Sequence, residues 1–393
     1  MPNFYTPEFS RDGRVFGLDI IRCLAILFVL IDHSLILLPP FFGKDLIREY
    51  SGTIGVELFF TLSGFLIGTI LLKAFTKNTS FSQKVRMNFW NRRWLRTLPA
   101  FIFYFTLYVL VTMLTGYEEF GNPDWKSIIS VLFFVQNFLF IQSNYFPISW
   151  SLAIEEWFYL LFPLSLSLLS SILKKANTRI FLLAIISFVV MSFMLRVGIF
   201  SLTKSGILTS LADNIGISQF QDRLNTGTRK IILLRLDAAS YGVLLAFFFY
   251  FYKEVLLQRS RFLFALGLLI TGIACFLYYD ITLSNFNFLS FVFSFPLFGI
   301  GFALMLPFIY TVSVNSLPPF LPPFIQNVSI ISYSVYLSHS IFLNLLQHWK
   351  GGDDNWGTSL VCVGVMLVAT YFISVVSYNF IEQRGMALRK AEA

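Results

Sequence analysis

Two ionisable residues, Arg22 and His33, lie in one long apolar segment near the start of the chain. They are eleven residues apart, about three turns of an α-helix, so both side chains would project from one face, about 16 Å apart along its axis. Imidazole titrates near neutral pH and suits general-base catalysis, whereas guanidinium suits phosphate binding. A packed histidine and an arginine whose charged end reaches a surface are the structural alternatives. The adjacent Asp32 would point to another side of the helix.

A second group of basic residues comes just before another apolar segment. Arg92, Arg93 and Arg96 lie close together, and Arg93 and Arg96 are about one helical turn apart. Arginine binds phosphate in a bidentate way through its planar fork of N–H donors. With Arg22, these residues could form the mouth of a site for a phosphate-bearing molecule. A topology signal at the flank of a membrane helix is the alternative.

The elements that must position these residues are membrane helices. Apolar residues make up 56% of the 393 and charged residues only 13%, whereas soluble domains carry about a quarter charged residues. Apolar stretches of about 20 residues recur along the chain, the length that a helix needs to cross about 30 Å of hydrocarbon. A β-barrel would show short alternating segments instead. The sequence therefore predicts an all-α fold, a polytopic membrane helical bundle, as a single domain over residues 1–393.

We expect about ten transmembrane helices. Their approximate ranges are 17–38, 53–73, 98–116, 150–172, 179–202, 231–252, 262–280, 287–310, 327–346 and 358–381. Residues 126–142 are apolar but short, and a crossing there would reverse every basic loop that follows. We therefore predict that this segment is re-entrant or lies on the surface.

The basic residues predict how the bundle is oriented. Seven of them lie between Lys73 and Arg96 without an acidic residue, which is typical of a cytoplasmic loop. Both termini would then be cytoplasmic and residues 203–230 and 347–357 would face outward, with the chain in the cell (inner) membrane. These loops account for the net charge of +8, so no nucleic acid partner is predicted. Neither a disulfide framework nor a metal site is expected from the three isolated cysteines, Cys23, Cys275 and Cys362.

Counted from the outward ends of these spans, a set of acids and bases lies at the depth of His33: Glu57, Glu155, Glu156, Arg235, Asp237 and His339. A charge within a span costs about 2.5–3.5 kcal/mol on insertion scales, so each needs a partner or a function. We expect a polar cavity that opens outward. In it, Glu155 or Glu57 would orient the imidazole of His33, and the other four would contact the substrate. Structural ion pairs, such as Arg235 with Glu57 or with Asp237, are the alternative.

Five sequence blocks together resemble the motifs of one membrane protein family. They are GLDIIR at 17–22 leading to His33, GVELFFTLSGFLI at 55–67, RWLR at 93–96, WSLAIEEWFY at 150–159 and ISYSVYLSH at 331–339. They occur in the order found in the acyltransferase family 3, and the resemblance covers nearly the whole chain. The first block is similar to the family's arginine and histidine signature, and the third to its cytoplasmic arginine pair.

The resemblance implies transfer of an acyl group, usually acetyl, from cytoplasmic acyl-CoA across the membrane to a hydroxyl of a carbohydrate, glycolipid or similar acceptor. Acyl-CoA would be a donor substrate rather than a bound cofactor. Arg22, Arg93 and Arg96 would hold the CoA phosphates, and the pantetheine arm would pass between the helices. His33 would then activate the acceptor hydroxyl as a general base. An acyl-histidine intermediate is compatible with this scheme.

Two departures from the family pattern matter. Residues 381–384 lack the proline that usually follows the family's glutamate, so Glu382 is assigned no role. No hydrolase-like domain follows residue 393, so we expect the membrane domain to handle the acceptor itself or to pass the acyl group to a partner. A transporter or flippase of a glycolipid or anionic solute is the alternative function, although we find no internal repeat. The acceptor, the acyl chain and the oligomeric state stay open.

Overall fold

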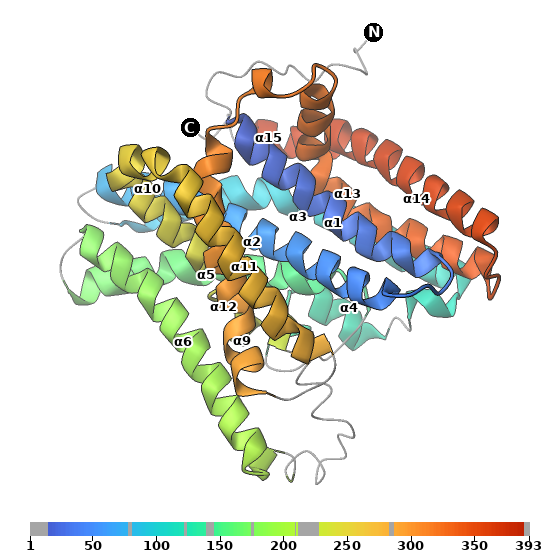
Figure 1. Cartoon of the computed structure of the whole chain (residues 1–393), viewed down its shortest axis with the longest axis horizontal. Helices are drawn as coiled ribbons and strands as arrows, with labels where there is room; N and C mark the ends of the chain where they lie inside the picture. Colours follow the sequence, from blue (N-terminus) through green and yellow to red (C-terminus); the bar gives the residue numbers. More distant parts are fainter. Residues whose placement is uncertain are drawn as a thin grey trace.

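The computed structural model describes residues 15–77, 81–121, 124–138, 145–173, 177–208, 210, 228–282 and 287–388. Within these ranges all regular structure is helical (Figure 1). Ten segments are long and apolar enough to cross a membrane, which confirms the predicted membrane bundle.

The ten segments follow one another along the chain, and the longest connections are those between α3 and α5 and between α6 and α9. They are α1 (Phe16–Leu37), α2 (Lys44–Lys77), α3 (Gln83–Thr115), α5 (Ser149–Ile172), α6 (Thr178–Lys204), α9 with α10 (Ile232–Arg235 and Ser240–Gln258), α11 (Ser260–Thr282), α12 (Phe288–Tyr310), α13 (Leu321–Lys350) and α14 (Trp356–Ser377). The last helix continues through a π-helical turn, η3 (Tyr378–Glu382), into α15 (Gln383–Leu388).

The short apolar segment after α3 does not form a span in its described part. Its helix α4 (Trp125–Leu132) has eight residues, about 12 Å of length, and cannot cross the hydrocarbon layer. This confirms the prediction for residues 126–138, and residues 139–144 lie outside the described part of the chain.

The turn between α1 and α2 shares one end of the bundle with residues 347–357, which are predicted to face outward. The ring of Phe41, between α1 and α2, lies 6.1 Å from that of Trp356 at the start of α14, and both turns are at the right of Figure 1. Most of the predicted outward loop 203–230 lies outside the described residues. Which end faces the cytoplasm stays a prediction.

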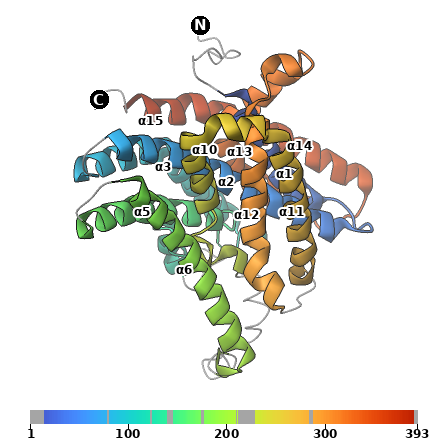
Figure 2. The ribbon, with the colours of Figure 1, turned by 60° about the vertical axis from the view of Figure 1, so that its left-hand side comes forward.

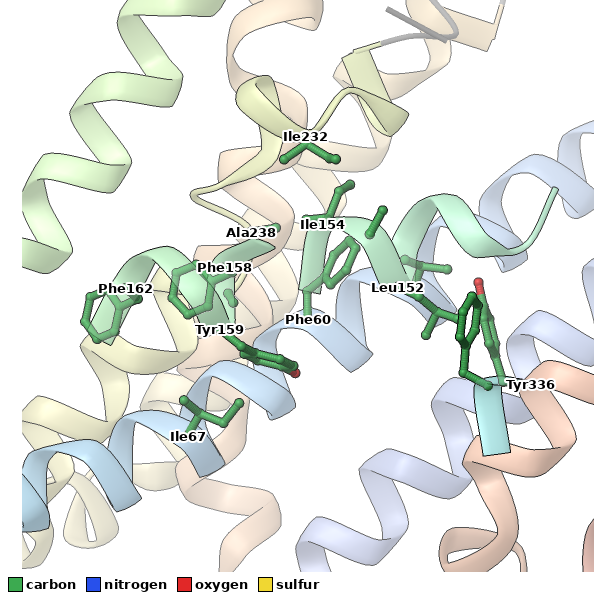
Figure 3. Close-up of a cluster of buried hydrophobic side chains, with 14 of the residues drawn as sticks. Phe60, Ile67, Leu152, Ile154, Phe158, Tyr159, Phe162, Ile232, Ala238 and Tyr336 are labelled. Carbon is green, nitrogen blue, oxygen red and sulfur yellow. The ribbon is translucent and has the colours of Figure 1, made fainter. Parts of the chain in front are cut away.

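Helix α2 lies between two clusters of buried apolar side chains. Phe60 and Ile67 contribute to a cluster with α5, in which Tyr159 is a central member (Figure 3). Leu62 and Phe65 pack on the other side against α10, α11 and α12, a group of neighbouring helices (Figure 2). Because lipid tails are as apolar as these side chains, close packing rather than water exclusion holds such helices together.

Two glycines allow α2 and α10 to approach each other closely. A Cβ atom at Gly64 would lie 1.9 Å from the carbonyl oxygen of Ala239, and one at Gly242 would lie 2.0 Å from that of Thr61. Real Cβ atoms never come so close. Small residues at such crossings let helix backbones pack directly against each other in membranes.

Two differences between the predicted and the observed spans affect the site. The third span begins at Gln83 rather than at residue 98, because Ser82 caps a longer helix by accepting a hydrogen bond from the backbone N–H of Val85. The sixth span is not continuous over 231–252, since a turn at residues 236–239 separates α9 from α10. The first difference places the arginine cluster inside α3. The second places Asp237 in the turn that directly follows Arg235.

Candidate active site

A cavity of about 570 Å³ lies between α2, α3, α5 and α13, and we call it the arginine cavity. Its charged lining residues are Arg22, Lys73, Arg92, Arg93, Arg96 and Glu155. Much of the remaining lining is apolar and comes from α2, including Phe59, Leu66 and Ile70. Five cations face one carboxylate, so the cavity suits a ligand with several negative charges and an apolar portion.

The two ends of the arginine cavity differ in exposure. Lys73 at the end of α2 and Arg92 near the start of α3 are exposed. At the other end, Ser151 and Tyr336 are buried, and their hydroxyl oxygens are 2.7 Å apart. The cationic end is therefore the mouth, and the cavity ends at Tyr336 on α13.

Arg93 and Arg96, predicted as a pair, both line the cavity but have different surroundings. Arg93 donates to the Tyr159 hydroxyl at 2.7 Å, lies over its ring and is 3.5 Å from Glu155. Arg96 makes no hydrogen bond or ion pair with any residue that the structure describes. A half-buried guanidinium in this state retains all its donors for an anionic ligand.

Arg22 and His33 face the same neighbouring helix, as their spacing predicts. The Arg22 guanidinium donates to Ser329 on α13 at 3.2 Å and lies 3.6 Å from Asp19. The ring of His33 meets that of His339, also on α13, with 4.6 Å between their centroids. Arg22 lines the arginine cavity, whereas neither histidine is among its lining residues.

The carboxylate nearest to His33 is not one of the two that were expected to orient it. The Nδ1 atom of His33 lies 2.9 Å from the carbonyl oxygen of Val29 and 3.6 Å from the carboxylate of Asp32. Glu57 and Glu155 are paired with arginines elsewhere. The expectation of an orienting glutamate is wrong, because α1 itself supplies both groups beside the imidazole.

The prediction that Glu155 and Glu156 lie at the depth of His33 is also wrong. Glu156 accepts hydrogen bonds from the indole N–H of Trp94 and the hydroxyl of Thr97, both at 3.2 Å. Both glutamates therefore lie beside the arginine cluster of α3. The early start of α3 causes this, because it brings the arginines into the bundle rather than leaving them in a loop.

Two buried ion pairs account for three further residues predicted at that depth. Arg235 is paired with Glu57, and both side chains are essentially inaccessible. Asp237 is paired with Arg196 at 2.7 Å and also accepts from the Tyr241 hydroxyl at 3.0 Å. The structural alternative thus describes these residues, and the expected contact of Arg235 and Asp237 with substrate is not supported.

Sequence reasoning missed Arg196 although a signal was present. It lies within the apolar stretch 179–202, where an unpaired charge is costly. Besides Asp237, it donates to the backbone carbonyl of Leu234 at 2.6 Å. Arg196 thereby satisfies a carbonyl that the break between α9 and α10 leaves free.

Glu382, to which no role was assigned, is buried where η3 meets α13. Its carboxylate accepts a hydrogen bond from Ser334 at 2.5 Å, and Ser334 also bonds to Ser377 at 3.2 Å. The π-helical turn ends at Glu382, and Gln383 follows it where the family usually has a proline. Such turns are frequent at functional sites.

A separate charged cluster surrounds the His33 end of α1. Asp32 is 3.3 Å from Arg48, and Glu49 is 3.6 Å from Arg229, whose guanidinium lies 5.2 Å from the centre of the Trp150 ring. Burial alone would lower the pKa of Arg229, but Tyr278 and Glu49 outweigh it and raise this pKa. We give the name His33-side cluster to Asp32, Arg48, Glu49, Trp150 and Arg229. They come from the helix ends opposite to the mouth of the arginine cavity.

Comparison with known proteins places these features in one family. A family model described as an acyltransferase domain matches residues 15–378. The chain is 36% identical over 174 residues, 40% of its length, to the peptidoglycan O-acetyltransferase OatA of Listeria monocytogenes. It is 30% identical over 203 residues, 46% of its length, to the O-acetyltransferase OatA of Staphylococcus aureus strain NCTC 8325.

These matches cover 25% and 31% of the two relatives, so the chain spans only between a quarter and a third of their lengths. No solved structure is significantly similar. The family match itself includes α1 to α14, the arginine cavity and both histidines. On this match, the chain is a membrane protein that belongs to the acyltransferase family.

Proposed function

We propose that this protein transfers an acyl group, in the first place acetyl, from acyl-CoA to a hydroxyl of a cell-surface or lipid-linked carbohydrate. The observation that carries the proposal is the arginine cavity. It has a cationic mouth and an apolar wall, and its deep end is next to two histidines. This order of features corresponds to the phosphates, the pantetheine arm and the thioester of an acyl-CoA molecule.

The mouth supplies the donors that CoA phosphates require. Arg92, Arg93 and Arg96 lie within about one turn of α3, and Arg22 faces the same space from α1. Guanidinium groups bind phosphate oxygens through paired N–H donors, and a ligand with several phosphates can use several of them at once. Arg96, with no partner among the described residues, is the strongest candidate for direct contact.

The acceptor would approach from the other side. The side chain of His33 is 23% exposed although it does not line the arginine cavity. Around it, the His33-side cluster offers two carboxylates and two guanidinium groups for sugar hydroxyls and the Trp150 ring for a sugar face. The relatives named as O-acetyltransferases, one of them of peptidoglycan, support a carbohydrate acceptor.

The chemistry would be a direct acyl transfer. His33 removes the proton of the acceptor hydroxyl, and the hydroxyl oxygen forms a bond to the thioester carbonyl carbon. The carbon–sulfur bond then breaks, and the CoA thiolate leaves and is protonated. His33 suits the role of base because imidazole is the side chain that most often serves in general-base catalysis. His339 would hold the His33 ring through their edge contact.

The test is an assay with the purified chain in detergent and acetyl-labelled acetyl-CoA. A soluble oligosaccharide of N-acetylated amino sugars, which models peptidoglycan, serves as the acceptor. We expect labelled ester on the oligosaccharide and release of free CoA, both lost without acceptor. Binding of acetyl-CoA without any acyl loss would overturn the proposal. Movement of intact oligosaccharide across a reconstituted bilayer without ester formation would favour a transporter.

A further inference from the structure

Tyr336 stands between the arginine cavity and the two histidines. Its side chain lines the cavity and is buried. On its other side, its ring lies 5.7 Å from the ring of His339, which in turn contacts His33. Because neither histidine lines the cavity, a group that moves from the cavity toward His33 meets the Tyr336 ring first.

Several contacts fix the Tyr336 side chain in this position. Its hydroxyl donates to the carbonyl oxygen of Ile148 at 2.9 Å and shares a 2.7 Å hydrogen bond with Ser151. The ring also meets the ring of Phe59 on α2, 6.3 Å away between centroids. In Figure 3 the side chain projects from α13 toward α5. Contacts with α5 and α2 therefore make it a rigid wall rather than a free side chain.

We propose that Tyr336 determines which acyl chains the donor can carry, by closing the deep end of the arginine cavity. The inference rests on the proposed function. Every acyl-CoA has the same phosphates and pantetheine arm, so arginines that hold the phosphates fix where the thioester lies. Each additional methylene must then extend toward Tyr336. A wall at this point admits an acetyl group and rejects longer chains, and one methylene in a tight pocket changes selectivity by about 10–200-fold.

The same wall would keep water away from the thioester. The partial exposure of His33 shows that its surroundings are accessible outside the cavity. The acceptor hydroxyl held by His33 reaches the thioester past the edge of the Tyr336 ring. Without the ring, free water near His33 could reach the donor as well. The water oxygen would bond to the thioester carbonyl carbon as the carbon–sulfur bond breaks, which releases a carboxylic acid and the CoA thiol. Loss of the wall should therefore cause hydrolysis that needs no acceptor.

The experiment compares acetyl-, butyryl- and hexanoyl-CoA as donors for the purified full chain. Tyr336→Ala should raise the ratio of kcat/KM for butyryl-CoA to that for acetyl-CoA by at least about 10-fold. It should also increase CoA release without acceptor. Tyr336→Phe keeps the ring and loses only the hydroxyl, so its ratio should stay within about 3-fold of the wild type. Tyr336→Leu, which keeps apolar bulk, should give an intermediate ratio and is the substitute where the alanine variant does not fold.

Tyr333 provides a matched control on the same helix. It also lines the arginine cavity, but its hydroxyl donates to the backbone of Thr97 at 3.1 Å, beside the arginine cluster. Tyr333→Ala should change activity with all three donors by a similar factor. Unchanged donor ratios in folded Tyr336→Ala or Tyr336→Leu protein would overturn the inference, as would a phenylalanine variant that behaves like alanine. If the wild type uses no acyl-CoA at all, the proposed function itself fails.

Discussion

The rings of His33 and His339 meet edge to face, with 4.6 Å between their centroids, although 306 positions separate them in the chain. Atom Nε2 of His339 is buried and has no hydrogen-bond partner among the described residues. A buried polar atom without a partner costs about 1–3 kcal/mol. We propose that this cost is tolerated because both histidines belong to the proposed site.

Replacement of the three histidines one at a time should separate their roles. His33→Ala should lower turnover by about 10²–10⁴-fold, the usual effect of removing a general base, while acyl-CoA binding stays intact. His348→Ala is the control, because His348 is stacked on Tyr117 and bonded to Glu119 away from both other histidines. It should retain full turnover. The measurements are acetyl transfer and CoA affinity in detergent.

His339→Ala tests whether the second histidine holds the first. We expect a smaller loss of turnover than for His33→Ala, and little further loss in the double variant, because both changes disable the same base. Full activity of folded His33→Ala protein would remove this residue from the mechanism.

The helix crossing of α2 and α10 should tolerate no methyl group. In Gly64→Ala and Gly242→Ala, the new Cβ would collide with the backbone oxygens of Ala239 and Thr61. The helices must separate, so the thermal midpoint in detergent should fall clearly in each variant. Gly272→Ala is the matched control, because nothing lies within 4 Å of a Cβ there. Equal midpoints for all three variants would contradict the described crossing.

The sequence alone predicts much of this fold because each span carries its own signal. Length and hydropathy locate a helix without reference to its neighbours, so the ten spans and the short α4 follow from the chain. The shared face of Arg22 and His33 also follows, since helical spacing fixes it. The motifs in family order predict the acyltransferase family, which the family model confirms.

Depth and partner choice were not predictable in the same way. Arg93 meets Glu155 because α3 begins at Gln83, well before the start at residue 98 that hydropathy indicated. The partner of Asp237 is Arg196, from a helix that offers no local clue to the pairing. Such contacts depend on how helices pack and bend, and one sequence without its relatives gives no information about these.

The buried pair of Glu57 and Arg235 should behave as a structural unit. Glu57→Gln or Arg235→Met alone leaves one buried charge without its partner and should destabilise the protein by about 3–5 kcal/mol. The double variant removes both charges and should be more stable than either single variant. Thermal unfolding in detergent measures all three. A double variant that is less stable than both single variants would show that the two residues do not act as a pair.

The orientation of the bundle can be tested with single cysteines. Cysteines at Lys84 and Asn225, in a background without the three native cysteines, should react with a membrane-impermeant reagent from opposite sides. The basic segment around Lys84 predicts the cytoplasmic side for it. Labelling of both positions from one side would refute the predicted orientation, and with it a cytoplasmic mouth for the arginine cavity.

The contrast between Arg96 and Arg93 gives the sharpest test of the donor site. Arg96 has no hydrogen-bond or ion-pair partner among the described residues, so Arg96→Ala should weaken CoA binding with little change in the thermal midpoint. Arg93→Ala should weaken binding and also lower the midpoint, because Glu155 and Tyr159 lose their partner.

The loss of affinity in both variants should be larger at low salt, where charge attraction is least screened. Lysine at position 96 should restore only part of the affinity, since it keeps the charge but lacks the fork. Binding isotherms for CoA and for pantetheine, which carries no phosphate, supply the readout. Only the affinity for CoA should depend on Arg96. If Arg96→Ala binds CoA as the wild type does at every salt concentration, this arginine is a topology signal and not a phosphate ligand.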